Sequence, residues 1–207
     1  MTRIIGGSAG GRRLRTPHGS TTRPTADRVR EALFSSLESE LGTVAGIRFL
    51  DLFAGSGAVG LEARSRGASY VVLVEADRQT AALIRGNVRD LGFDDVEVHA
   101  MRAERFVESL AHPGDDNAQD QPFDVVYVDP PYAMGTPELG EVLDNLVRSA
   151  RVSDETVVVV ERSRRGSGWN WPDAMRGVRE RRYGETMLYY GRPAGATVVE
   201  PGSDPVP

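Results

Sequence analysis

Two aspartates each end an apolar run in this sequence, and each is followed by residues of a kind that could hold a ligand. Asp51 ends "IRFLD" and precedes a glycine-rich loop at 55–60. Asp129 ends "FDVVYVD" and precedes the Pro-Pro-Tyr sequence at 130–132. Ligands of open α/β sheets bind beyond the carboxyl ends of the strands. If both runs are parallel strands, the loop and Asp129 therefore face one crevice.

The glycine loop has the G-x-G-x-x-G spacing of nucleotide-binding turns, and Glu75 follows Gly55 by 20 residues. A dinucleotide would place its pyrophosphate at such a loop and its ribose on the acid. Asp51 would repel a pyrophosphate but attract the sulfonium and ammonium groups of S-adenosylmethionine. The sequence therefore favours S-adenosylmethionine over NAD, and over a tight turn that binds nothing. The predicted cofactor-binding residues are Asp51, Phe53, Gly55, Ser56, Gly57, Glu75, Ala76, Ala103 and Asp129.

The Asp-Pro-Pro-Tyr sequence offers hydrogen-bond acceptors on a backbone that two prolines restrict. The Asp129 carboxylate and the Pro130 carbonyl match the two hydrogens of a planar exocyclic amine, and Tyr132 can stack on its ring. Such an amine is a poor nucleophile, because its lone pair is delocalised into the ring. Holding both hydrogens out of plane turns the lone pair toward a methyl donor. Asp129, Pro130, Pro131 and Tyr132 are therefore the predicted catalytic residues of an amino-methyltransferase, although this short sequence alone is also an ordinary turn.

Strands alternate with helices along most of the chain, a pattern typical of a parallel sheet covered on both faces. Apolar runs predict strands at 47–53, 70–75, 96–100, 123–129 and 155–161. Helical spacing predicts helices at 58–66, 78–91 and 136–150. A terminal antiparallel hairpin is expected over 178–192, around Gly184. The predicted fold class is therefore α/β.

The first 45 residues form a smaller unit in this interpretation, followed by the catalytic domain at 46–192. Turn residues over 3–14 predict a short hairpin, and apolar spacing predicts a helix over 26–41 that Thr25 caps. This hairpin-plus-helix extension is too small to bury a core alone, so it should lie against the main domain. Two polar segments are expected to lack regular structure, 113–122 as a surface loop and 193–207 as a disordered tail.

The composition excludes several classes of protein. The 207 residues are 40% hydrophobic and 27% charged, which suits a folded domain. No apolar run approaches the ~20 residues of a membrane helix. With no cysteine and three histidines, we expect a cytoplasmic protein without a metal site. The net charge of −5 hides two basic segments, residues 1–30 at +6 and residues 162–182 at +5. These segments indicate either a polyanionic partner or merely solvated ends.

These motifs closely resemble those of the bacterial 16S ribosomal RNA guanine-N2 methyltransferases of the RsmD type. The resemblance covers residues 2–192 and is carried by "RIIGGSAGGRRL", "TRPTADRVREALF", "FLDLFAGSGAVGLEARSRGA", "VEAD", "FDVVYVDPPY" and "RRYGETMLYYGR". It implies a Rossmann-like S-adenosylmethionine-dependent methyltransferase sheet of order 3-2-1-4-5-7-6, with S-adenosylhomocysteine as product. Two residues depart from the family's pattern: Tyr132, where relatives often have Phe, and Arg102, near the expected adenine position.

The resemblance also implies a partner, 16S rRNA in the small ribosomal subunit or in a late assembly intermediate. The basic segments would then bind phosphates from the N-terminal hairpin, the start of the following helix and the end of the fifth strand. The predicted RNA-binding residues are Arg3, Arg12, Arg13, Arg15, Arg23, Arg30, Arg162, Arg164 and Arg165. Nothing in the sequence requires more than a monomer. Two other functions stay open: a DNA adenine or cytosine amino-methyltransferase, and a catalytically inactive RNA-binding assembly factor.

Overall fold

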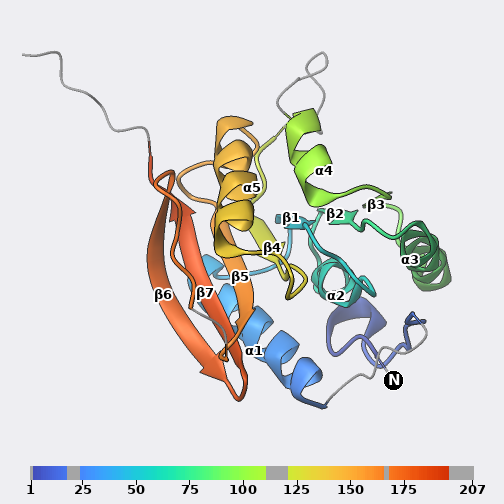
Figure 1. Ribbon diagram of the computed structural model, residues 1–207. Coiled ribbons are helices and arrows are strands. Elements are labelled where there is room, and N and C mark those ends of the chain that lie inside the picture. The colour runs from blue at the N-terminus through green and yellow to red at the C-terminus, as the bar shows by residue number, and fades with distance from the viewer. Residues whose placement is uncertain (1, 18–23, 111–120, 166–167, 196–207) are drawn as a thin grey trace, which may run out of the picture.

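A computed structural model describes residues 2–17, 24–110, 121–165 and 168–195 (Figure 1). Its centre is a seven-stranded sheet of order β3-β2-β1-β4-β5-β7-β6, which confirms the order predicted above. The strands are β1 (Arg48–Asp51), β2 (Tyr70–Val74), β3 (Val96–His99), β4 (Val125–Val128), β5 (Val157–Ser163), β6 (Met175–Tyr183) and β7 (Thr186–Pro193).

The sheet is parallel from β3 to β5 and antiparallel at its other edge. β7 pairs antiparallel with both β5 and β6, and Gly184 lies in the turn that joins β6 to β7. Strand β7 extends to Pro193, and the Ala194 amide donates to the Ala174 carbonyl at 2.8 Å. The predicted tail therefore begins later than residue 193. Residues 113–120 of the predicted loop and 196–207 of the predicted tail lie outside the described residues.

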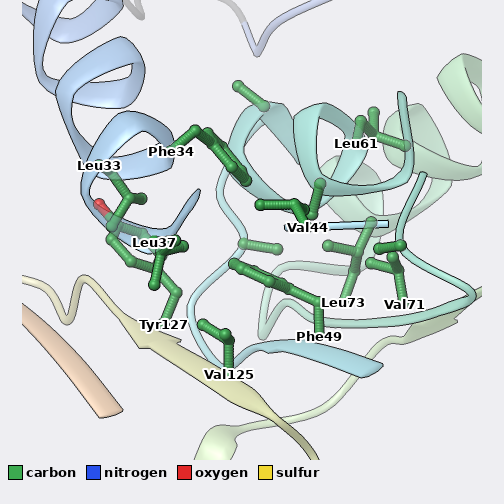
Figure 2. Close-up of a cluster of buried hydrophobic side chains, with 14 of the residues drawn as sticks. Leu33, Phe34, Leu37, Val44, Phe49, Leu61, Val71, Leu73, Val125 and Tyr127 are labelled. Atoms are coloured by element: carbon green, nitrogen blue, oxygen red, sulfur yellow. The ribbon is translucent and has the colours of Figure 1, made fainter. Parts of the chain in front are cut away.

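Helices cover both faces of the sheet (Figure 1). One face carries α1 (Pro24–Leu41), α2 (Ala58–Ser65) and α3 (Arg78–Leu91), and the other carries α4 (Ala103–Leu110) and α5 (Thr136–Arg148). A hydrophobic core lies between each face of the sheet and its helices. Figure 2 shows the core on the α1 face, where Leu33 and Leu37 of α1 lie near Tyr127 and Phe49 of the sheet. None of the described helices is long and apolar enough to cross a membrane.

Two helices differ from the sequence prediction. The sequence analysis did not predict helix α4, although Ala103, Phe106 and Val107 have helical spacing and are buried. The sequence signal for this helix was therefore present and was overlooked. Helix α1 begins at Pro24, so Thr25 lies inside the helix and not at the N-cap position predicted for it. Proline suits the first helical position, because its missing N–H would have no partner there.

The N-terminal segment, residues 2–17, lies against α2 and folds back on itself as the predicted short hairpin. The Ile4 and Leu14 amides donate to the Arg12 and Thr2 carbonyls, each at 2.9 Å. One isolated antiparallel bridge joins Arg3 to Arg13, and a short 3-10 turn, η1 (Gly7–Ala9), lies between them. Gly7 has a φ of +76°, and a Cβ atom there would lie 1.9 Å from the Ser65 carbonyl oxygen. The close approach to α2 therefore requires glycine at position 7.

Glu62 of α2 is the buried anchor of this N-terminal segment. Its side chain is 0% exposed, and its oxygens accept the amide N–H groups of Ile5 (2.6 Å) and Gly6 (2.8 Å). The guanidinium groups of Arg66 and Arg30 lie 2.8 Å and 3.7 Å from the same carboxylate. Burying a carboxylate is costly unless charges and N–H donors surround it. Glu62 and the N-terminal segment therefore stabilise each other.

Candidate active site

Four polar side chains share one face of the sheet near the carboxyl ends of three adjacent strands. The β1–β4 register pairs Asp51 with Tyr127. The β4–β5 register pairs Val128 with Val160, and continuing it by one residue places Asp129 beside Glu161. Side chains alternate between the faces of a strand, so Tyr127, Asp129 and Glu161 project to the same side as Asp51. The sheet thus brings three carboxyl groups to one place.

Three hollows meet at this edge of the sheet. The large cavity, of about 540 Å³, is bordered by Glu75, Ala76, Arg102, Ala103 and Glu104. The small cavity, of about 210 Å³, is bordered by Thr2, Arg30, Asp51, Ser56, Tyr127 and Glu161. The outer recess, of about 30 Å³, is bordered by Pro130, Tyr132, Glu161 and Arg162. Phe53 and Gly55 border both cavities, and Asp129 borders all three hollows. Asp51 and Asp129 therefore face a shared site, as the sequence predicts.

Each glycine of the loop at 55–60 is required for a different structural reason. Gly55 and Gly57 have φ values of +52° and +79°, which side chains other than hydrogen disfavour. A Cβ atom on Gly60 would lie 2.1 Å from the Leu73 Cδ2 atom, so α2 packs closely on β2. The Gly60 amide also donates to the Asp51 Oδ2 atom at 3.3 Å. These contacts fix the loop against β1 and β2.

Asp51 combines burial with an unused acceptor. The residue is 1% exposed, and among the described residues no donor reaches its Oδ1 atom. Burial raises the pKa of Asp51 to about 7, against the opposing effect of the Gly60 and Phe53 amides. The nearby Glu75 carboxylate contributes a smaller part of this rise. A buried acceptor of this kind at a cavity wall fits a cationic ligand group.

Glu75 braces the glycine loop, a role that the sequence analysis missed. Its two oxygens accept the amide N–H groups of Gly55 (2.9 Å) and Asp77 (2.8 Å). Each carboxylate oxygen can still accept a second hydrogen bond, as ribose hydroxyls would require. At the other side of the large cavity, Arg102 binds Glu104 at 2.9 Å and holds the pKa of that carboxyl below its usual range.

The Asp-Pro-Pro-Tyr turn is held by its own backbone and by β5. The Met134 amide donates to the Pro131 carbonyl at 2.9 Å, and the Arg162 Nη1 atom donates to the Met134 carbonyl at 3.2 Å. The Arg162 guanidinium also lies over the Trp169 ring, 5.6 Å from its centroid. Tyr132 is 93% exposed, so its ring is open to a stacking partner. Arg162 thus supports the turn, which the sequence analysis did not predict.

Glu161 and Tyr127 are site residues that the sequence analysis missed altogether. The Tyr127 hydroxyl donates a hydrogen bond to the Glu161 Oε2 atom. Burial raises the pKa of Asp129 well above its usual range, and the nearby Glu161 and Asp51 carboxylates raise it further. Burial also raises the pKa of Glu161, whereas the Tyr127 hydrogen bond lowers it. A signal was present, because Glu161 ends an apolar run as Asp51 and Asp129 do.

The predicted RNA-binding arginines at the N-terminus divide into two groups. Arg12 donates to the Asp90 carbonyl at 2.7 Å, and Arg15 pairs with the Asp90 carboxylate at 2.6 Å, so both attach the segment to α3. Arg3 and Arg13 are exposed, and their side chains make no ion pair with a described residue. Arg23 lies outside the described residues.

The remaining arginines of the predicted set already have protein partners. Arg30 is 5% exposed and donates to the Arg3 carbonyl at 2.7 Å and to Asp27 at 3.0 Å. This burial favours a role in positioning the N-terminal segment over contact with RNA phosphates. Arg164 and Arg165 both pair with the Glu185 carboxylate, at 3.8 Å and 2.9 Å, and remain exposed.

The sheet order, the glycine loop with its acids and the Asp-Pro-Pro-Tyr turn define a Rossmann-like methyltransferase that uses S-adenosylmethionine. Solved structures agree with this class. A putative methyltransferase yhhF from Escherichia coli is 33% identical, with a TM-score of 0.74 over 93% of this chain and 98% of that one. A hypothetical protein from Thermus thermophilus is 35% identical, with a TM-score of 0.73 over 92% and 98% of the two chains.

The family follows from the sequence matches. The family model described as "Conserved hypothetical protein 95" matches residues 2–192. Ribosomal RNA small subunit methyltransferase D of Escherichia coli K12 is 38% identical over 159 residues, 77% of this chain and 73% of that protein. A putative rRNA methyltransferase, YlbH of Bacillus subtilis, is 35% identical over 63% of this chain and 66% of its own length. The chain belongs to this RsmD family of S-adenosylmethionine-dependent rRNA methyltransferases.

Proposed function

We propose that this protein transfers a methyl group from S-adenosylmethionine to the exocyclic N2 amine of a guanine in 16S rRNA. The substrate in this proposal is the small ribosomal subunit or a late assembly intermediate. One observation carries the proposal: Asp129 borders both cavities and the outer recess, where the exposed Tyr132 ring lies. A base stacked on Tyr132 would thus present its amine to Asp129 at the junction of the three hollows.

The two cavities divide the methyl donor between them. The large cavity suits the adenosine part, with Glu75 at the ribose hydroxyls and Ala76 and Ala103 against adenine. The small cavity suits the methionine part, with the unpartnered Asp51 oxygen for a cationic group. When bound, S-adenosylmethionine supplies an electrophilic methyl group on a sulfonium.

The chain's own residues prepare the amine. Asp129 and the Pro130 carbonyl accept its two hydrogens and so direct the nitrogen lone pair away from the ring. In the transfer, the N2–CH3 bond forms as the S–CH3 bond breaks, and positive charge grows on N2. The Asp129 carboxylate stabilises that charge and then takes the N2 proton. The raised pKa of Asp129 makes its carboxylate a stronger base for this step.

Donor binding should weaken on acidification because of Asp51. Its pKa of about 7 means that the carboxylate is largely ionised at pH 8 and largely protonated at pH 6. Only the ionised form attracts a cation, so the Kd for S-adenosylmethionine should rise about tenfold from pH 8 to pH 6. Calorimetry at both pH values measures this change. Asp51→Asn should bind weakly at both, and an unchanged pH dependence in that variant would assign the titration to another group.

Arg3 and Arg13 are the best candidates for RNA contact. They face each other across the single bridge, beside Thr2 at the small cavity. Like charges placed opposite each other are unfavourable unless an anion lies between them. The double variant Arg3→Gln/Arg13→Gln should therefore weaken binding to small subunits and reduce the slope of log K against log salt by about 2.

A matched control for this double variant is Arg148→Gln, which lies at the C-terminal end of α5. It should leave the salt slope unchanged. An unchanged slope in the double variant would show that these arginines do not contact RNA. Deleting residues 1–20 is a poorer test, because it would also remove Ile4 and Leu14 from the core.

A labelled-donor assay tests the substrate class. Small subunits from cells that lack this protein, naked 16S rRNA and duplex DNA would each be incubated with the enzyme and S-adenosylmethionine labelled on its methyl group. The proposal predicts that label enters small subunits fastest. Faster labelling of DNA would support the DNA amino-methyltransferase, and no labelling of any substrate would support the inactive assembly factor.

A further inference from the structure

Glu161 has no part in the methyl transfer described above, yet it stands at the same junction. It borders the small cavity and the outer recess, and Asp129 borders both as well. The two residues are neighbours across the β4–β5 register and project to one face of the sheet. Any base that brings an amine to Asp129 therefore presents a second atom to Glu161.

The Glu161 carboxylate is held in a fixed orientation. The Tyr127 hydroxyl donates to its Oε2 atom. Tyr127 is itself 4% exposed and belongs to the core that Figure 2 shows, near Leu33 and Leu37. No described residue donates a hydrogen bond to the other oxygen, Oε1. Glu161 thus offers one oriented acceptor toward the hollows.

Two neighbouring carboxylates favour a ligand with two neighbouring N–H donors. Each raises the energy of the other's charge, and N–H donors would relieve this repulsion. The one cation bordering the outer recess, among the described residues, is Arg162. Its Nη1 atom already binds the Met134 carbonyl. Its Nη2 atom has no hydrogen-bond partner, so no described residue donates a hydrogen bond to both acids.

Bases differ in what lies beside their exocyclic amine. Guanine has a donor, N1–H, next to its N2 amine, whereas adenine and cytosine have a ring nitrogen that only accepts. We propose that Glu161 accepts the N1–H of the target guanine while Asp129 accepts from N2, so that Glu161 determines base specificity. This inference rests on the proposed function, N2 methylation of guanine.

The test compares two bases in two enzymes. Small subunits would be reconstituted with rRNA that carries guanine or 2-aminopurine at the position that the wild-type enzyme methylates. 2-Aminopurine keeps the amine but has an acceptor at N1, so the Glu161 carboxylate would face a lone pair. We expect kcat/KM in the wild type to favour guanine by about 100-fold or more. In Glu161→Gln the amide can donate to N1, and the ratio should fall below about tenfold.

Controls separate base recognition from folding and donor binding. Glu155→Gln, before the start of β5, should keep the wild-type ratio. The Kd for S-adenosylhomocysteine, measured by calorimetry, should be the same in Glu161→Gln and the wild type. Tyr127→Phe is a second variant, which frees the Glu161 side chain without changing its charge. Tyr127→Phe should lower the ratio of kcat/KM for guanine to kcat/KM for 2-aminopurine several-fold.

The outcomes are distinct. An unchanged base ratio in Glu161→Gln or in Tyr127→Phe would overturn the role of Glu161 and leave the proposed function intact. A loss of S-adenosylhomocysteine affinity equal to the loss of rate would place Glu161 at the donor and overturn its role too. If the wild-type enzyme forms no N2-methylguanosine on guanine-containing subunits, the proposed function itself fails.

Discussion

Replacing Asp129 by asparagine is expected to lower kcat by about 1,000-fold while changing the Kd for S-adenosylmethionine far less. The asparagine side chain has nearly the same shape, so the Asp-Pro-Pro-Tyr turn should persist. It carries no charge, however, and cannot take a proton from the amine. Single-turnover measurements with labelled donor would give the rate of the chemical step, and calorimetry would give the donor affinity.

Asp154→Asn is a suitable control for this variant, because Asp154 is an exposed aspartate between α5 and β5. It should retain both the rate and the affinity of the wild type. If Asp129→Asn instead loses donor affinity by the same factor as rate, Asp129 acts on the donor and its assignment to the amine is wrong.

Replacing Glu62 by alanine should lower the free energy of unfolding by about 3–5 kcal/mol. The change would leave the partly buried amides of Ile5 and Gly6 without their acceptor, and it would remove the carboxylate that lies 3.7 Å from the buried Arg30 guanidinium. Urea denaturation would measure the loss. Hydrogen exchange should show that the amides of Ile5 and Gly6 lose their protection before the sheet does.

Two further variants calibrate this result. Glu62→Gln keeps one acceptor oxygen and should lose less stability than the alanine variant. Glu108→Ala, an exposed position on α4, should change the free energy of unfolding by less than about 0.5 kcal/mol. A loss below about 1 kcal/mol in Glu62→Ala would mean that the N-terminal segment is held by its apolar contacts instead.

The sheet could be predicted from the sequence because its strands carry strong local signals. Four consecutive valines at 157–160 and the run at 70–74 are unbroken apolar stretches, which parallel strands covered on both faces require. The order of the strands came from the family resemblance. Helix α4 has helical apolar spacing that the sequence analysis overlooked, whereas the position of the N-terminal segment depends on its contacts with α2.

The site was predictable where function depends on residues next to each other in the sequence. Asp51 with its glycine loop, and Asp129 with its prolines, could be found in this way. The roles of Glu62, Arg30 and Arg162 depend on partners that are distant in the sequence. Whether an arginine binds an RNA phosphate or forms an internal ion pair depends on its burial, and the composition of the sequence does not reveal burial. The role of Tyr127 could not be predicted for the same reason, because its hydroxyl binds Glu161, which is distant in the sequence.

The identity of the methylated atom tests the central claim most directly. Small-subunit rRNA from cells that lack this protein would be incubated as intact subunits with the purified enzyme and S-adenosylmethionine, then digested to nucleosides and analysed by mass spectrometry. We expect one new N2-methylguanosine with the wild-type enzyme and none with Asp129→Asn. A methyl group on a ring nitrogen, on a ribose, or on an adenine or cytosine amine would contradict it.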